Sequence, residues 1–255
     1  NWDGVIITHS AFGLIKAPGA FEERMLNEEL ERYKEALENV PDDQRTTRKR
    51  MEKLIENMEQ RLSAVQGRKQ DDGVAFEQLG VDMLFVDEAH EFRKLSFATS
   101  QGNVKGIDPT GSQKAWDLYV KSQYLDGQRP GRSLVLMSGT PVTNTMGEMY
   151  TVQRYLQRQE LERKGLADFD AWSGQFTDTR SVTEQTPAGG YKVVTRLARF
   201  VNMAELLRMF RDVADAVRSS DLDGYVTRPV VKGGGLELIT AEATTAMQSY
   251  QEELG

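Results

Sequence analysis

The sequence predicts an α/β fold built on a parallel sheet with helices on its faces. Three short apolar runs carry this prediction: Val5–Ile7, Met83–Val86 and Leu134–Met137. Each run is too short for a helix and lacks polar alternation, which is the pattern of strands buried on both faces of a parallel sheet. Segments with helical periodicity separate and follow the runs, as expected for helices that flank such a sheet.

Polar residues follow each run directly, and we name these groups the Thr8, Asp87 and Ser138 clusters. They comprise Thr8-His9-Ser10, Asp87-Glu88-Ala89-His90 and Ser138-Gly139-Thr140-Pro141. In an open parallel sheet, ligands bind beyond the carboxyl ends of the strands. We therefore expect the three clusters to lie along one edge of a single crevice, which is the predicted functional site.

The Asp87 cluster holds two carboxylates directly after a predicted buried strand. A hard cation that bridges phosphates prefers a carboxylate oxygen at a fixed position, often through water, and the end of the strand gives Asp87 that rigidity. Glu88 could then orient or deprotonate an attacking water. The alternative is that the two carboxylates only cap the next helix.

The Ser138 cluster lies about fifty residues further on, where a parallel neighbour would place it beside Asp87. Gly139 permits close approach of the backbone. The hydroxyls of Ser138 and Thr140 can bond to the carboxylates or to His90. A tight turn before a helix is the alternative, but two such clusters after successive core strands favour a functional site.

A helical insertion at 19–73 separates the first two predicted strands. Apolar residues recur in it at heptad spacing: Leu26, Leu30, Tyr33, Leu37 and Val40, and then Met51, Leu54, Met58, Leu62 and Val65. Two such helices joined by a short turn form an antiparallel hairpin.

The two arms of this hairpin differ in charge. Residues 22–38 carry seven acidic and three basic side chains, whereas residues 45–69 carry eight basic and three acidic ones. Arms of opposite charge would pair with each other. In the alternative, the basic side chains at the tip contact a phosphate backbone or another partner. These side chains are Arg45, Arg48, Lys49 and Arg50.

The remaining elements complete a division into three parts. Helices are expected over 112–125, 148–156, 204–217 and 241–254, an exposed loop over 96–113, a loop-like stretch over 165–190, and a hinge at Gly233-Gly234-Gly235. Residues 1–18 and 74–240 would form one partial lobe around the insertion, and residues 241–255 would begin a following helix or linker.

The composition excludes several classes of protein and site. The 255 residues include no cysteine and two histidines, so a disulfide scaffold, a thiolate zinc site and a histidine-rich metal site are excluded. No apolar stretch approaches the roughly 18 residues of a membrane span, no signal peptide is found, and a cytoplasmic location is expected. The net charge of −7 gives no general basic footprint, so DNA contact would use a local basic strip. Because the chain opens on a predicted core strand, we expect it to be a piece of a longer protein.

Three segments together resemble superfamily 2 helicases of the Swi/Snf type. Motif II of that family is similar to V-D-E-A-H at 86–90. Motif III is similar to S-G-T-P-V-T-N-T at 138–145, which continues into E-M-Y-T-V-Q-R-Y-L at 148–156. The segment that contacts one DNA strand resembles V-I-I-T-H-S-A-F at 5–12. The stretches at 106–125 and 191–206 are similar to phage- and plasmid-encoded proteins that combine a helicase with an adenine-specific DNA methyltransferase. The resemblance implies the later part of the first RecA-like lobe of such a motor, with a fused methyltransferase domain as a further expected partner.

The resemblance also implies cofactors and residue roles. ATP and Mg²⁺ would be the cofactors, with Asp87 holding the metal through water and Glu88 acting as the catalytic base. His90 would couple the nucleotide site to motif III through Ser138 and Thr140, with Gly139 between them. The residues of the Thr8 cluster, Thr8, His9 and Ser10, would contact the backbone of DNA, expected to be double-stranded.

Two departures from the family pattern limit what this chain would do alone. The dipeptide Gly-Lys is absent, so the phosphate-binding loop G-x-x-x-x-G-K-[ST] is missing, and so is the second RecA-like lobe. Both would be partners supplied by the same parent protein, and this segment alone should hydrolyse ATP negligibly. The alternative is a non-enzymatic interaction module that uses the charged hairpin. A metal-dependent nuclease is the weaker third hypothesis, because no further carboxylate cluster follows a predicted strand.

Overall fold

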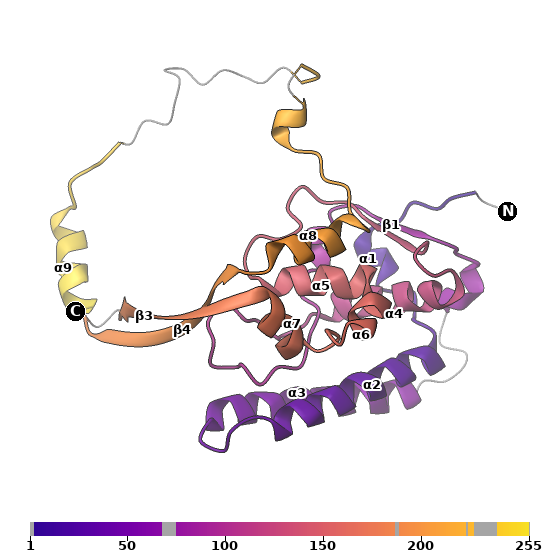
Figure 1. Ribbon diagram of the computed structural model, residues 1–255, viewed down its shortest axis with the longest axis horizontal. Helices are drawn as coiled ribbons and strands as arrows, with labels where there is room; N and C mark the ends of the chain where they lie inside the picture. The colour runs from indigo at the N-terminus through magenta and orange to yellow at the C-terminus, as the bar shows by residue number, and fades with distance from the viewer. Residues whose placement is uncertain (1–2, 68–74, 187–188, 223, 227–238, 255) are drawn as a thin grey trace.

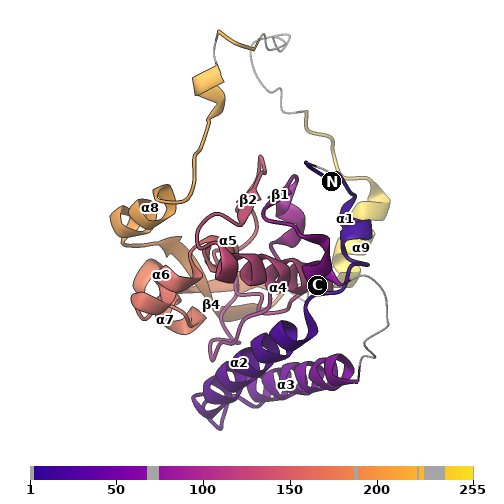
Figure 2. The same ribbon diagram turned by 90° about the vertical axis from the view of Figure 1, so that its right-hand side faces the viewer.

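The computed structural model describes residues 3–67, 75–186, 189–222, 224–226 and 239–254 and contains a short parallel sheet of two strands. Strand β1 (Leu84–Val86) pairs in parallel with β2 (Leu134–Leu136), in the register Leu84 to Leu134 and Val86 to Leu136. Helix α4 (Gln113–Gln128) lies in the connection between the two strands and is below them in Figure 2. The predicted α/β class and two of the three predicted strands are therefore confirmed.

The third predicted strand, Val5–Ile7, is wrong. These residues are extended but exposed, and they pair with no strand in the described part of the chain. A strand requires a neighbour that accepts and donates its backbone hydrogen bonds, and none is present here. The N-terminal segment joins the lobe instead through the single turn α1 (His9–Phe12) and through a bridge between Lys16 and Ala75. Burial of the sheet on both faces is also wrong, because Phe85 of β1 is exposed.

Helix α4 forms the centre of the first hydrophobic core. The hydroxyl of Ser112 accepts a hydrogen bond from the amide of Ala115 at 3.2 Å, which satisfies a donor that the first helical turn leaves free. The helix is buried on most sides against the sheet, α2 and α5 (Gly147–Leu156). The predicted helices at 112–125 and 148–156 are thus present. Helices α4 and α5 pack with β1 and β2 in this first hydrophobic core.

The predicted helical hairpin is confirmed as α2 (Gly19–Glu38) and α3 (Arg45–Gln66), which pack side by side along one side of the lobe (Figures 1 and 2). Its core consists of the predicted heptad positions, with Leu30, Tyr33, Val40, Met51 and Met58 buried together. The carboxylates of α2 do not pair mainly with α3. Glu28 and Glu29 instead bind arginines of α6 (Arg158–Arg163) and α5, which attach the hairpin to the lobe.

The prediction of a loop-like stretch at 165–190 is wrong. It contains α7 (Phe169–Phe176) and β3 (Thr177–Gln185), and β3 pairs antiparallel with β4 (Tyr191–Phe200) in a long ribbon. Phe169, Trp172 and Phe176 fill a second hydrophobic core, which explains why α7 forms. The same core buries Phe97, so the segment 96–113 is not the exposed loop that its polar composition predicts.

The remaining helices are short. They are the 3₁₀ turns η1 (Phe76–Leu79), η2 (Ala89–Phe92) and η3 (Ser219–Leu222), and the helices α8 (Met203–Arg211) and α9 (Thr245–Leu254). Helix α8 ends six residues before the predicted Val217, and α9 agrees with the helix expected at 241–254. The predicted hinge at 233–235 lies outside the described residues. Among the helices that are described, none combines the length and apolar character needed to cross a bilayer.

Candidate functional site

The Asp87 and Ser138 clusters lie side by side at the carboxyl ends of β1 and β2, an edge that we call the rim. Backbone hydrogen bonds continue past the strands. The amide of Met137 donates to the carbonyl of Val86 at 2.8 Å, and the amide of Ala89 donates to the carbonyl of Met137 at 2.9 Å. These bonds hold the residues after one strand against the residues after the other. The juxtaposition that the sequence predicts for the two clusters is therefore present.

The backbone of Glu88 gives the rim an unusual turn. Its φ of 49° and ψ of 44° lie in the left-handed region, which non-glycine residues seldom adopt and which costs about 1–3 kcal/mol. The carboxylate of Asp87 accepts the amide of Glu88 at 2.9 Å and supports the turn. Glu88 precedes η2 but makes no side-chain capping bond, so capping does not account for its carboxylate. Both acidic side chains are exposed at the rim.

His90 lies half-buried between two carboxylates. Its Nδ1 atom is 3.0 Å from the carboxylate of Glu88, without the alignment of a hydrogen bond, and its Nε2 atom is 3.6 Å from that of Glu91. No hydrogen bond joins it to Ser138 or Thr140 within the residues that the structure describes. The coupling role expected of His90 therefore stays a prediction.

Arg93, three residues after His90, contacts the Ser138 cluster where a contact from His90 was expected. Its guanidinium donates to the carbonyl of Thr140 at 3.1 Å and to the hydroxyl of Thr143, and it lies 3.6 Å from the carboxylate of Glu148. Glu148 in turn accepts the amides of Thr143 and Asn144 at 2.7 and 3.1 Å. This nearly buried ion pair fixes the loop that leaves the Ser138 cluster. Neither residue lies in a polar cluster, so only their opposite charge near the two clusters could have indicated them.

The Ser138 cluster itself is a compact turn. The amide of Thr140 donates to the hydroxyl of Ser138 at 3.1 Å. A Cβ atom added at Gly139 would meet no atom within 4 Å. Packing therefore does not require glycine at this position, and the backbone there is open to close approach by a ligand.

The Thr8 cluster reaches the same rim from the other side of β1, although it does not follow a strand. The hydroxyl of Thr8 caps α1 by accepting the amide of Ala11 at 3.2 Å. The Nε2 atom of His9 lies 3.1 Å from the carbonyl oxygen of Asp87, a hydrogen-bond distance. Thr8 and Ser10 are exposed. All three predicted clusters thus meet at one edge, as expected from their positions after the apolar runs.

Lys121 of α4 holds α1 in this position. Its fully buried ammonium donates to the carbonyl of Phe12 at 2.9 Å and to the carboxylate of Asp117 at 2.6 Å. Burial lowers the pKa of Lys121, and the hydrogen bond and charge of Asp117 oppose that shift. A cation at the last carbonyl groups of a helical turn is a favourable arrangement.

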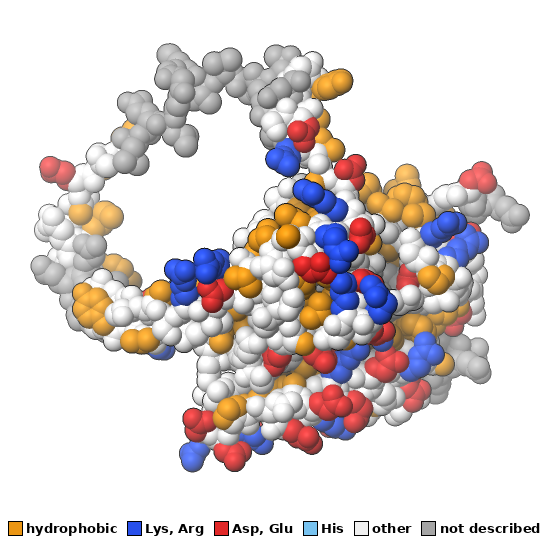
Figure 3. All heavy atoms as spheres, viewed as in Figure 1, with side chains coloured by type: hydrophobic (Ala, Val, Ile, Leu, Met, Phe, Trp, Pro, Cys, Tyr) orange, Lys and Arg blue, Asp and Glu red, His pale blue; other side chains and the backbone are white. Residues whose placement is uncertain are grey.

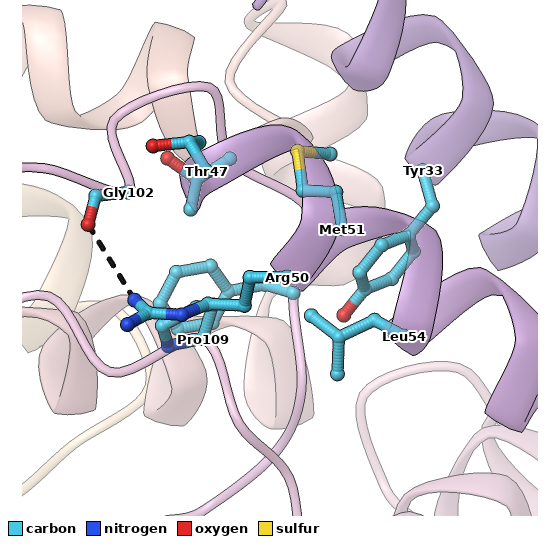
Figure 4. A pocket seen from close by; sticks show the side chains of 9 residues that line it. Tyr33, Thr47, Arg50, Met51, Leu54, Gly102 and Pro109 are labelled. Atoms are coloured by element: carbon cyan, nitrogen blue, oxygen red, sulfur yellow. Dashed lines mark hydrogen bonds between the residues drawn. The ribbon is translucent and has the colours of Figure 1, made fainter. Parts of the chain in front are cut away.

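The basic tip of the hairpin does not lie at the rim. Arg50 reaches the carbonyl of Gly102 at 3.5 Å (Figure 4), and Arg48 donates to the carbonyl of Val40 at 2.9 Å. The cavity at this junction measures about 10 Å³, which leaves room for a single water at most. Arg45 and Lys49 remain exposed. Figures 1 and 2 both place the hairpin on the side of the lobe opposite β1.

A cleft of about 320 Å³ borders the rim beside β2. Three successive residues of β2, Leu134, Val135 and Leu136, line it together with Arg93 and Ser138. Successive side chains of a strand point to opposite faces, so a cleft that all three line runs along the edge of the strand. This is the edge of β2 that faces away from β1, and no described strand pairs with it.

Most of the chain matches a known protein family, and part of it matches a phage protein. The family described as "Probable helicase domain" matches residues 1–218. The chain is 29% identical over 162 residues to the "Defense against restriction protein B" of Escherichia phage P1, which covers 59% of this chain but 7% of that protein. No solved structure matches the chain significantly. The match over residues 1–218 includes all three clusters, and the chain belongs to the probable helicase domain family.

Proposed function

We propose that this chain is the later part of the first RecA-like lobe of an ATP-driven DNA translocase or helicase of the Swi/Snf type. The juxtaposition of the Asp87 and Ser138 clusters at one rim carries this proposal. An exposed pair of carboxylates beside a hydroxyl-bearing turn provides both a cation ligand and polar groups that can respond to a nucleotide.

The donor set at the rim fits Mg²⁺ that arrives with a nucleotide. Mg²⁺ at phosphates is held by one or two carboxylates, the phosphates and several waters. No group of three or more acidic, histidine or cysteine side chains that could hold a metal occurs in the described ranges, so a protein-only metal cage is not the better fit. Asp87 would hold the ion through water. When bound, Mg²⁺–ATP supplies the phosphoryl group and offsets the charge that develops on it.

The protein groups at the rim would then act in sequence along one edge. Glu88 would accept a proton from the attacking water. Ser138 and Thr140 would bond to groups at the nucleotide site, and Arg93 with Glu148 would transmit their position to α5. His90 stays within reach of Glu88 and would orient its carboxylate.

The Thr8 cluster supports DNA as the polymer that this motor would follow. Thr8 and Ser10 expose their hydroxyls, which suit the phosphate backbone. His9 connects them to the carbonyl of Asp87. A shift of the DNA strand would therefore move Asp87, the proposed metal ligand. The name of the phage P1 relative, which refers to restriction, also favours DNA. We place the activity in the cytoplasm, within a larger phage- or plasmid-encoded protein that can include an adenine-specific methyltransferase.

The free edge of β2 supports a further part of this proposal. In a parallel ladder, alternate residues bond to each neighbour, and Ser133 and Met137 bond to β1. Leu134 and Leu136 therefore direct their backbone groups toward the cleft. A strand that carries the phosphate-binding loop would pair there. A second RecA-like lobe would close over the rim and supply arginines that raise the rate of ATP hydrolysis about 10³–10⁵-fold.

The interaction-module alternative has less support from the hairpin. Two of its four basic tip residues, Arg48 and Arg50, are engaged within the chain, and α2 is bound to the lobe. Arg45 and Lys49 remain available for a weak contact with phosphates.

The proposed function is tested by measuring ATP hydrolysis by the intact protein with and without duplex DNA. We expect slow turnover that DNA accelerates, with Mg²⁺ required. An equal rate of ATP hydrolysis with and without DNA, or no ATP hydrolysis under any condition, would contradict the proposal. Cleavage of the DNA backbone without ATP consumption would instead favour a nuclease.

A further inference from the structure

The β3–β4 ribbon extends beyond the lobe, and Val194 is buried between exposed residues in its outer half. Leu197 and Phe200 contact the second hydrophobic core, whereas Tyr191 and Val193 near the tip are 77% and 69% exposed. Figure 1 shows the ribbon reaching away from α5 and α7. Stability does not explain large exposed apolar residues at the end of such an element, which points to a binding role.

The two faces of the ribbon differ in chemistry. Tyr191 and Val193 share one face with Thr195, and the residues paired with them are Gln185, Thr183 and Ser181. This face carries no charge. The next residue along, Lys192, begins the opposite face, which also bears Arg180, Glu184 and Arg196. One face is therefore aromatic and uncharged, and the other carries the charged side chains around the apolar pair of Val182 and the buried Val194.

The ribbon is basic in an acidic chain. Residues 177–200 carry four basic and two acidic side chains, while the chain has a net charge of −7. Both carboxylates are already neutralised: Asp178 binds Arg199 at 3.0 Å, and Glu184 binds Lys105 at 2.6 Å as well as Arg196. Figure 3 shows basic side chains gathered over the middle of the ribbon. The excess positive charge favours a polyanion.

We infer that this ribbon binds single-stranded nucleic acid, with Tyr191 stacked on an unpaired base on one face and the strand passing around the tip of the ribbon to place a phosphate beside Lys192 on the other face. Base stacking on aromatic side chains, combined with cationic contacts to the backbone, is how proteins bind single strands without reading sequence. An acidic protein would satisfy the charge, but it would leave the aromatic, uncharged face without a matching group. This inference goes beyond the proposed ATPase, because binding at Tyr191 needs no nucleotide.

The test measures the affinity of the purified chain for a fluorescently labelled single-stranded oligonucleotide by anisotropy. Tyr191→Ala is expected to weaken binding about 5- to 150-fold, the usual effect of losing one base-stacking contact. Tyr191→Phe retains the ring and should bind like the original chain. Tyr225→Ala is the matched control, since Tyr225 is 88% exposed but lies outside the ribbon, and it should change nothing.

A charge variant tests the second half of the inference. Lys192→Glu should lower affinity and reduce the dependence of affinity on salt, because a phosphate contact is lost. Equal affinities for Tyr191→Ala and Tyr225→Ala, or an original chain that does not bind single strands, would overturn the inference. Far-ultraviolet circular dichroism confirms that each variant is folded. A protein that binds single strands through Tyr191 yet hydrolyses no ATP would contradict the proposed motor and leave this inference intact.

Discussion

Replacing Glu88 by glutamine in the intact protein is expected to lower DNA-stimulated ATP turnover about 10²–10⁴-fold, the usual contribution of a general base. Glutamine keeps the size and polarity of the side chain but cannot accept the proton of the attacking water. The left-handed backbone at Glu88 is preserved, because the substitution changes one atom of the side chain. Nucleotide binding should therefore remain, and steady-state turnover and fluorescent-nucleotide binding measure the two effects separately.

Glu91→Gln provides the matched control for this prediction. Glu91 lies three residues further on in η2, and its hydrogen bond and ion pair with Lys114 lower its pKa. Glu91 lies 3.6 Å from His90 but has no proposed role in proton transfer, so its variant should turn over ATP close to the original rate. Unchanged turnover in Glu88→Gln, or an equal loss in both variants, would remove Glu88 from the catalytic role.

The second large effect concerns the attachment of the hairpin to the lobe. Replacing Glu29 by leucine should lower the free energy of unfolding by about 3–5 kcal/mol, because it leaves Arg154 buried without its counter-charge. The two side chains are 5% and 3% exposed, and their charged atoms lie 2.5 Å apart. Burial lowers the pKa of Arg154, but the charge of Glu29 and nearby tyrosines raises it above its ordinary value. Arg154 also donates to the carbonyl of Ser96 at 2.6 Å.

Urea unfolding followed by circular dichroism measures this effect. The surface pair of Glu160 and Arg163, at 2.6 Å with the arginine 71% exposed, is the control, and Glu160→Gln should change stability little. A double replacement of Glu29 and Arg154 by leucine should recover part of the loss, since no unpaired charge remains. If Glu29→Leu costs no more than Glu160→Gln, the hairpin is not held by this pair.

Local signals predicted the elements whose stability is local. The heptad positions of α2 and α3 identified these helices correctly, because such spacing acts within a few turns of the helix. The run Val5–Ile7 was misassigned because an apolar run forms a strand only beside a partner. The ribbon was missed because β3 is largely exposed on both faces and so lacks an apolar alternation.

The site divides in the same way. Ligands bind at the carboxyl ends of parallel strands, and this rule predicted from the sequence that Asp87 and Ser138 lie close together. The pairs Arg93–Glu148 and Glu29–Arg154 join residues 55 and 125 positions apart. No periodicity encodes such pairings, because they depend on how α5 packs against the sheet and against α2.

Cleavage of the backbone by bound iron tests whether the Asp87 and Ser138 clusters share one nucleotide and metal site. Fe²⁺ bound in place of Mg²⁺ with ATP is oxidised by added hydrogen peroxide, and the hydroxyl radicals that this releases cut the nearest peptide bonds of the intact protein. The account predicts ATP-dependent cuts in both the Asp87 and the Ser138 clusters, and their loss in Asp87→Asn. Cuts at neither cluster, or at one of them alone, would contradict a shared nucleotide and metal site at this rim.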